Sequence, residues 1–438
     1  MNHHRLPLSC AILLGLALAG GLLGACTQGV PEPPAGPTGT PPLIGQPALP
    51  GPTSPPEASA SQTQALTLTL WTTEAFSPTQ EVPQGQILAA QVASLPDLRL
   101  RFVLKQPYGQ AGIQRYLLNT GAAVPGLLPD LAYVDVDEVD EIVRSGLAQP
   151  LDTLLSSNLV VGLYGFAREV CTFEGRLYCL QIEADLDHLV YNSFRLPRAP
   201  ISWSGVISQS VPYVFPAGGE GGLVNDAFLV QLQALRPSSD EAENGASFLD
   251  ESSLVAVLQF YRDGASQDLF PQAILQYHTT DDSWQAYRSG LAAMAQVSAH
   301  RYLAERSQAV FAMPAPIPSI GGPAAPTARG WALVLITPDP ARQAEAARFM
   351  ELWLSPETNA AWNRAAGTLP TLKSSLAYWD PADAYTAFLH QQLLAAYPRP
   401  TIPGYSQVAS ALQEAVEAVL TGDLTPEEAA AEVMSNAP

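Results

Sequence analysis

The sequence predicts an α/β fold. Strand and helix patterns alternate between residues 65 and 147, and residues 340–433 are mainly helical. Alternation of this kind is typical of a mostly parallel sheet with helices on both faces. Of the 438 residues, 47% are hydrophobic, which is enough for a substantial core split over two domains.

The individual elements follow from hydrophobic periodicity. Alternating or short buried apolar runs predict strands at 65–71, 98–104, 131–134 and 331–336. Apolar stripes at helical spacing predict helices at 84–95 and 139–147. Further helices are expected at 340–354, 356–366, 380–396, 406–421 and 425–433.

The N-terminal residues have the layout of a secretory signal peptide. Arg5 gives a weakly basic start, and Leu6–Ala25 carries no charge. The ending, Leu22-Leu23-Gly24-Ala25-Cys26, resembles a bacterial lipobox. The resemblance implies that residues 1–25 are removed and that the Cys26 sulfur carries a diacylglyceryl group. The alternative is a transmembrane anchor, which Pro7 and four glycines disfavour.

A proline-rich segment follows the cysteine. Residues 27–65 contain eleven prolines and few aromatic or β-branched side chains. Such a segment buries too little apolar surface to offset the entropy of ordering it. We therefore expect residues 26–65 to be a lipidated cysteine with a disordered linker, rather than a ligand for proline-recognition modules.

Charge and motif content exclude several classes of function. The formal net charge is −20, with only two lysines, Lys105 and Lys373. This balance argues against nucleic acid or an anionic membrane surface as a partner. The six histidines show no metal-ligand spacing, and no nucleophile-elbow, phosphate-loop or dinucleotide motif is present. We expect no metal, no cofactor and no catalytic residue.

The segment Cys171–Cys179 predicts a β-hairpin with Glu174-Gly175 at its turn. Its two cysteines lie symmetrically about the turn. In an exported protein such a pair is expected to form a disulfide.

Nine short segments follow one another along the chain in an order and at a spacing that can be compared with known families. They are Pro129–Asp135, Gly146–Asp152, Phe173–Tyr178, Tyr191-Asn192, Gly290–Met294, Gly330–Val334, Phe349–Pro356, Gly367–Thr371 and Pro403–Tyr405. Together they resemble family 1 extracellular solute-binding proteins of ABC importers, the maltose/maltodextrin-binding-protein-like group. The resemblance covers nearly all of residues 66–438.

The resemblance implies a two-lobed, periplasmic-binding-protein-like clamp with hinge crossings between its lobes. Lobe 1 would take residues 66–185 with 335–372, and lobe 2 residues 186–334 with 373–438. The crossings would fall near Asp185, Leu333 and Pro370.

The implied function is that of a membrane-tethered, extracytoplasmic substrate-binding subunit, not an enzyme. It would capture a carbohydrate or similar polyhydroxylated solute by lobe closure and deliver it to ABC transporter permease subunits. We expect a monomer, anchored to the cell membrane by its lipid. The alternatives are a secreted glycosidase using Asp185 with Glu74 or Asp137, and a surface adhesion lipoprotein without a transport role.

The resemblance also implies which residues bind the solute. Carried over one by one, they are Glu74, Asp137, Asp185, Tyr213, His300, Trp331 and Tyr405. Carboxylates accept hydrogen bonds from hydroxyl groups, and aromatic faces stack on the C–H faces of sugar rings.

Each candidate also has a purely structural interpretation. Glu74 and Asp137 lie at strand-to-helix junctions, where acids cap helices. Asp185 lies on the same strand face as Glu183 and Asp187, so either of these acids could contact the ligand in its place. Trp331 and Tyr405 can equally be core aromatics, and the position of His300 usually carries a large aromatic in this group.

Overall fold

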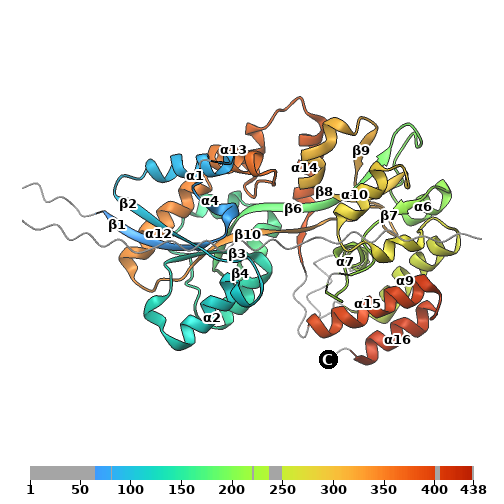
Figure 1. Ribbon diagram of the computed structural model, residues 1–438, viewed down its shortest axis with the longest axis horizontal. Helices are drawn as coiled ribbons and strands as arrows, with labels where there is room; N and C mark the ends of the chain where they lie inside the picture. Colours follow the sequence, from blue (N-terminus) through green and yellow to red (C-terminus); the bar gives the residue numbers. More distant parts are fainter. Residues whose placement is uncertain (1–64, 80, 220, 236–248, 400–404, 437–438) are drawn as a thin grey trace, which may run out of the picture. The chain divides into compact units, whose positions relative to one another are not determined.

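The computed structural model describes residues 65–79, 81–219, 221–235, 249–399 and 405–436 (Figure 1). The predicted signal peptide, Cys26 and all but the last residue of the predicted linker lie outside these ranges. Within them, no helix combines the length and the apolar character needed to cross a membrane.

Residues 66–135 contain the predicted parallel strands. β1 (Leu66–Thr72) lies between β2 (Leu98–Leu104) and β3 (Leu131–Asp135) and pairs in parallel with both. Helices α1 (Pro83–Ala93) and α2 (Ile113–Ala123) provide the crossovers. These three strands begin and end within one residue of the predicted bounds, so the prediction is confirmed.

Two longer strands make the sheet mixed rather than mostly parallel. β10 (Thr327–Leu335) is antiparallel to both β3 and β6 (Cys179–Asn192). The strand order is β2-β1-β3-β10-β6-β8-β7. The difference has a physical reason: β10 comes from the part of the chain around β8 and β9, so it enters the β1–β3 region at the edge where β3 ends.

A second group of strands lies around the C-terminal half of β6 (Figure 1). β8 (Met294–Ser298) and β9 (Ala312–Ala315) are antiparallel to β6, and β7 (Tyr213–Val214) is parallel to β8. β11 (Tyr397–Pro398) pairs in parallel with the start of β10. The helices of this region are α6 (Trp203–Gln209), α7 (Asp226–Gln233), α9 (Glu251–Ser266), α10 (Thr280–Arg288) and α11 (Ala299–Glu305).

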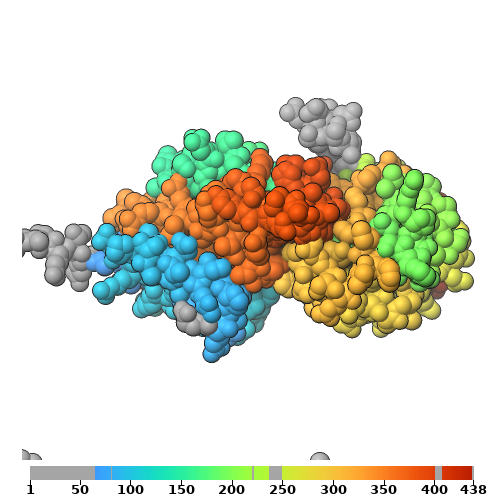
Figure 2. Space-filling model, turned by 90° about the horizontal axis from the view of Figure 1, so that it is seen from above, coloured from blue at the N-terminus to red at the C-terminus, as the bar shows by residue number. Residues whose placement is uncertain are grey.

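The C-terminal part is helical, as predicted. Its helices are α12 (Pro340–Trp353), α13 (Pro356–Ala366), α14 (Ala384–Ala395), α15 (Tyr405–Thr421) and α16 (Pro426–Asn436). α13 packs on α1, and α14 contacts β9. Figure 2 shows this orange and red part of the chain next to both the blue and the yellow residues.

Short helices complete the architecture. They are α3 (Val139–Arg144), α4 (Ser157–Gly162), α5 (Gly165–Glu169), and the 3-10 helices η1 (Glu74–Phe76), η2 (Gly109–Ala111), η3 (Pro125–Leu127), η4 (Val136–Glu138), η5 (Gln272–Gln276), η6 (Arg306–Gln308) and η7 (Lys373–Tyr378).

The buried apolar residues form two large clusters. The first core includes Leu70, Tyr133, Ile182, Val334 and Trp353. The second core includes Leu186, Val214, Tyr261, Ala295 and Val416. β6 and β10 contribute residues to both clusters, so these two strands join them.

The predicted hairpin and its disulfide are both confirmed. β4 (Thr172–Phe173) and β5 (Arg176–Leu177) are antiparallel, and a disulfide joins Cys171 to Cys179. Glu174 and Gly175 have φ of 50° and 77°, and positive φ at both central residues suits a tight hairpin turn.

Candidate ligand-binding site

The carboxyl ends of the parallel strands meet at one edge of the sheet. Glu74 lies two residues after the end of β1, Lys105 directly follows β2, and Asp137 lies in η4 after β3. Trp331 joins this edge because antiparallel β10 places it opposite Asp135. In open α/β sheets, ligands bind outside the carboxyl ends of the strands.

Aromatic rings gather at this edge. Trp331 is half-buried and stacks on Tyr133, with ring centroids 4.9 Å apart and planes inclined by 19°. The ring of Tyr108 lies 5.7 Å from that of Trp331, and Tyr108 is 54% exposed. We call Trp331 and Tyr108 the aromatic platform.

A carboxylate holds the platform in place. The Tyr108 hydroxyl donates a 2.6 Å hydrogen bond to Asp135. Burial, together with the neighbouring Asp135, raises the pKa of Tyr108. The hydroxyl therefore stays protonated and remains a donor near neutral pH.

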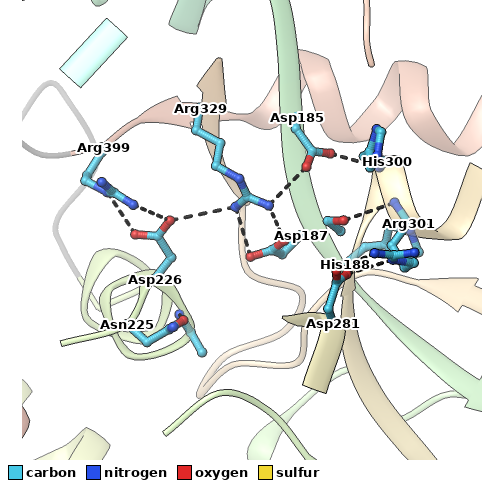
Figure 3. A network of polar contacts seen from close by, with 12 residues as sticks. Asp185, Asp187, His188, Asn225, Asp226, Asp281, His300, Arg301, Arg329 and Arg399 are labelled. Carbon is cyan, nitrogen blue, oxygen red and sulfur yellow. Dashed lines mark hydrogen bonds and ion pairs between the residues drawn. The ribbon is translucent and has the colours of Figure 1, made fainter. Parts of the chain in front are cut away.

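Two arginines organise the acidic residues beside the platform, and we call this group the Arg–Asp network (Figure 3). Arg329 donates to Asp187 at 2.7 and 3.1 Å and to Asp185 at 3.1 Å. Its guanidinium also lies 3.8 Å from Asp226. Arg399 donates two hydrogen bonds to Asp226, at 2.8 and 2.9 Å, and forms an ion pair with Asp137.

Backbone register explains this arrangement. Arg329 on β10 lies opposite Asp185 on β6, and the register shifts just afterwards, between Trp331 and Ala332. Gly330 has a φ of 148°, and a Cβ at this position would collide with the carbonyl oxygen of Glu183. Only glycine allows this close approach of the two strands between Arg329 and Trp331.

The Arg–Asp network links segments that are distant in the chain. Asp137 follows β3 of the first core, whereas Asp226 begins α7 of the second. Arg399 contacts both carboxylates. Burial raises the pKa of Asp137 to about 6, although Arg399 opposes the rise. For Asp226, burial also opposes ionisation, but Arg399 and Arg329 hold its pKa below the usual value.

A cavity of about 390 Å³ adjoins the Arg–Asp network. Its lining includes Asp187, Asn225, Asp226, His278, Thr279, Thr280, Arg329 and Arg399, with Leu223 and Val224 as the apolar members. Its volume suits a small molecule, and its polar wall offers many hydrogen-bonding atoms.

The structure brings four of the predicted residues close to this site or its network. Trp331 belongs to the platform, and Asp137 and Asp185 belong to the Arg–Asp network. The backbone N–H of His300 donates to Asp185 at 3.0 Å, while its ring lies 3.0 Å from the Gly367 carbonyl oxygen.

The other three lie differently. Glu74 is exposed in η1, at the end of β1. Tyr213 is 1% exposed in the second core, where its hydroxyl accepts a 2.8 Å hydrogen bond from Gln296. Tyr405 is the first residue of α15, and its side chain lies outside the described part of the chain.

Glu183 and Asp187, the two alternatives to Asp185 on β6, have different hydrogen-bond and ion-pair partners. Glu183 is 7% exposed and accepts hydrogen bonds from the Tyr133 hydroxyl and the Trp362 indole. Asp187 pairs with Arg329 at the cavity wall.

Sequence analysis missed Tyr108, Asp226, Arg329 and Arg399. One signal for Arg329 exists: residues 306–338 contain no Asp or Glu, so this arginine has no local partner and must pair at a distance. Arg399 follows a two-residue strand, and no pattern marks it.

Comparisons with known proteins agree with this architecture. Residues 106–390, well over half of the chain, match the family described as bacterial extracellular solute-binding protein. No match to a curated protein sequence was found.

Three solved structures share the fold at low sequence identity. The cyclic α-maltosyl-1,6-maltose binding protein of Arthrobacter globiformis is 18% identical with a TM-score of 0.68, covering 85% of this chain and 97% of its own. The sugar-binding protein MalE of Xanthomonas citri is 18% identical with a TM-score of 0.67, covering 85% and 96%. Maltose-bound MalE3 of T. maritima is 20% identical with a TM-score of 0.62, covering 84% and 98%.

The matched family consists of proteins that bind solutes outside the cytoplasm, not of enzymes. Because the match spans most of the chain and the fold agrees, the chain belongs to the bacterial extracellular solute-binding protein family.

Proposed function

We propose that the chain is the substrate-binding subunit of an ABC importer and reversibly captures an oligosaccharide or similar polyhydroxylated solute. The observation that carries the proposal is the position of the aromatic platform next to the Arg–Asp network: Trp331 lies two residues after Arg329 on β10 and opposite Asp135, two residues before Asp137. The aromatic platform offers ring surface, and the Arg–Asp network offers hydrogen-bonding atoms from residues of both cores.

This combination suits sugar chemistry. The platform offers an aromatic surface to the C–H face of a pyranose ring. The carboxylates of Asp137, Asp187 and Asp226 retain lone pairs that can accept from ligand hydroxyls. The structural neighbours described as binding maltose and a cyclic maltosyl-maltose support a carbohydrate as the solute.

Capture would proceed by closure of two lobes, 66–185 with 335–372 and 186–334 with 373–438. The proposed crossings near Asp185 and Leu333 fall on β6 and β10, and these strands contribute to both cores. The third lies near Pro370, next to Leu369, whose backbone N–H donates to Ala184. Closure would be favoured by contacts that the ligand makes with both lobes at once.

The experiment that tests this function is a thermal-shift screen with a panel of neutral oligosaccharides. A ligand at one hundred times its Kd should raise apparent stability by about 2.7 kcal/mol, and we expect a Kd near or below 1 μM, about −8 kcal/mol. Chromatography of the recovered ligand should show it unchanged. A panel without any shift would contradict carbohydrate binding, and a cleaved product would favour the glycosidase alternative.

We further propose that Cys26 is lipidated, so that the protein is anchored to the cell membrane and hands its solute to permease subunits. Cys26→Ala should abolish metabolic lipid labelling, because the acceptor sulfur is lost. Persistent labelling of this variant would contradict the anchor. Importer permease genes beside this gene would favour transport over a surface adhesion role.

A further inference from the structure

We infer that the second core carries a membrane-docking surface at the C-terminal end of β6, and that its partner is the surface of a bilayer containing anionic phospholipids. We call this surface the apolar–basic patch. It consists of the exposed side chains of Phe194, Arg195, Arg198, Leu291, Val310 and Phe311. The inference goes beyond the proposed function and does not depend on which solute is bound.

Three chain segments meet at the end of β6, between β8 and β9 (Figure 1). The backbone N–H of Asn192, the last residue of β6, donates to the carbonyl oxygen of Ala293 at 2.9 Å, two residues after Leu291. On the side of β9, the backbone N–H of Ser193 donates to the carbonyl oxygen of Phe311 at 2.9 Å. These contacts bring the loops that carry the patch residues to one end of the sheet.

The patch exposes an unusual amount of apolar surface. Phe194 is 82% and Phe311 55% exposed, and their ring centroids lie 5.8 Å apart. Val310 and Leu291 are 77% and 68% exposed. Contiguous exposed apolar side chains mark a contact site for a protein or a membrane.

The patch is basic although the whole chain is acidic. The formal net charge is −20, but residues 188–219, 289–304 and 306–338 contain no Asp or Glu. These three segments supply every residue of the patch. Arg195 and Arg198 are both exposed, and within the described ranges neither is paired with a carboxylate.

The acids that border these segments are balanced by arginines. Glu305, five residues before Val310, forms an ion pair with Arg301. Asp383 precedes α14, which contacts β9, and it forms an ion pair with Arg306. Neither acid therefore offsets the positive charge of the patch.

Charge complementarity selects an anionic bilayer as the partner. Each arginine near such a surface strengthens binding about fivefold, and exposed phenyl rings can enter the boundary between headgroups and acyl chains. The Debye length is about 8 Å at physiological salt, so the acids farther away on the protein repel the bilayer only weakly. A symmetric contact with a second copy is disfavoured, because it would bring Arg195 and Arg198 of both copies together.

The proposed lipid anchor would keep this partner within reach. Cys26 and Leu66, the first residue of β1, are 40 positions apart, and a chain of that length spans at most about 140 Å. Tethering raises the effective concentration of the bilayer at the patch, so a weak contact is sufficient. Asn192 lies five residues after Asp187 on β6, about 17 Å away, and the patch is thus separate from the ligand site.

The test measures binding to protein-free vesicles by flotation. The probe is the chain from residue 27 onwards, which keeps both cores but lacks the proposed anchor. We expect it to bind vesicles of three parts phosphatidylcholine and one part phosphatidylglycerol at least tenfold more tightly than vesicles of phosphatidylcholine alone. The difference should shrink as salt is added.

Two double variants separate the charged and apolar parts of the patch. Arg195→Gln with Arg198→Gln should reduce the preference for anionic vesicles at least tenfold. Phe194→Ser with Phe311→Ser should weaken binding to the anionic vesicles at least tenfold, because the rings no longer enter the interface. Circular dichroism and the melting temperature should stay unchanged, since all four side chains are exposed.

The matched control combines Arg115→Gln with Leu127→Ser. Arg115 is exposed on α2 and Leu127 is 68% exposed in η3, both outside the patch. This variant should bind the anionic vesicles like the unchanged chain. An equal loss in the control would overturn the assignment to the patch.

Other outcomes also overturn the inference. Absent binding, or equal binding to both kinds of vesicle, excludes an anionic bilayer as the partner. Binding only to native membranes that retain their proteins would reassign the patch to a membrane protein. A dimer in sedimentation velocity that is lost in the double phenylalanine variant would reassign it to a second copy. None of these results affects the test of sugar binding.

Discussion

Replacement of Arg329 by methionine is expected to lower the free energy of unfolding by about 3–5 kcal/mol, the usual cost of removing one partner from a buried ion pair. The loss follows from the positions of Asp185, Asp187 and Asp226, whose side chains are only 17%, 10% and 10% exposed. Without the guanidinium, the nearly buried carboxylates of Asp185 and Asp187 lose the cation that they share, whereas Asp226 keeps its pair with Arg399. Denaturant unfolding at pH 7 measures the effect.

The matched control is Arg288→Met. Arg288 pairs with Glu305, but these side chains are 34% and 30% exposed, and such surface pairs contribute only about 0–1 kcal/mol. The deficit of Arg329→Met should also shrink as the pH is lowered, because the unpaired carboxyls then take up protons. Equal effects of the two substitutions would contradict the structural role of the Arg–Asp network.

Replacement of Trp331 by alanine is expected to weaken solute binding more than tenfold, at least about 1.4 kcal/mol. The indole is the part of the platform held by Tyr133 beneath it and by Tyr108 beside it, so its removal takes away a positioned stacking surface. Isothermal titration with the tightest ligand of the panel measures the loss, and circular dichroism checks that the fold persists.

Tyr378→Ala is the control for this substitution. Tyr378 is 48% exposed in η7 and donates its hydroxyl to Glu357, away from the platform. The Tyr378→Ala variant should bind the solute with the same affinity as the unchanged protein. Undiminished binding by a folded Trp331→Ala protein would exclude the platform as the stacking site.

The fold was predictable where the signal was local. The alternating run 98–104 coincides with β2, and the turn residues Glu174-Gly175 marked the hairpin. The direction of β10 was not predictable in this way, because periodicity reports which side chains are buried and not which neighbour a strand pairs with. The parallel β1–β3 arrangement was therefore expected to continue, and the antiparallel β10 and β6 made the sheet mixed.

The candidate site was only partly predictable for a related reason. Trp331 and Asp185 were reachable through motifs in their own strands. The Arg399–Asp137 pair joins residues 262 positions apart, and no local pattern encodes such a contact. Tyr213 illustrates a further limit. It opens the short strand β7, and the local sequence is the same whether such an aromatic faces a cleft or, as here, lies in a core and accepts a hydrogen bond from Gln296.

Small-angle X-ray scattering, with and without the tightest ligand of the panel, tests the central claim most directly. If the chain captures its solute by closing two lobes, saturating ligand should reduce the radius of gyration, and dialysis should restore it. Trp331→Ala should show no reduction at the same ligand concentration. A ligand that binds tightly yet leaves the radius of gyration unchanged would contradict capture by closure.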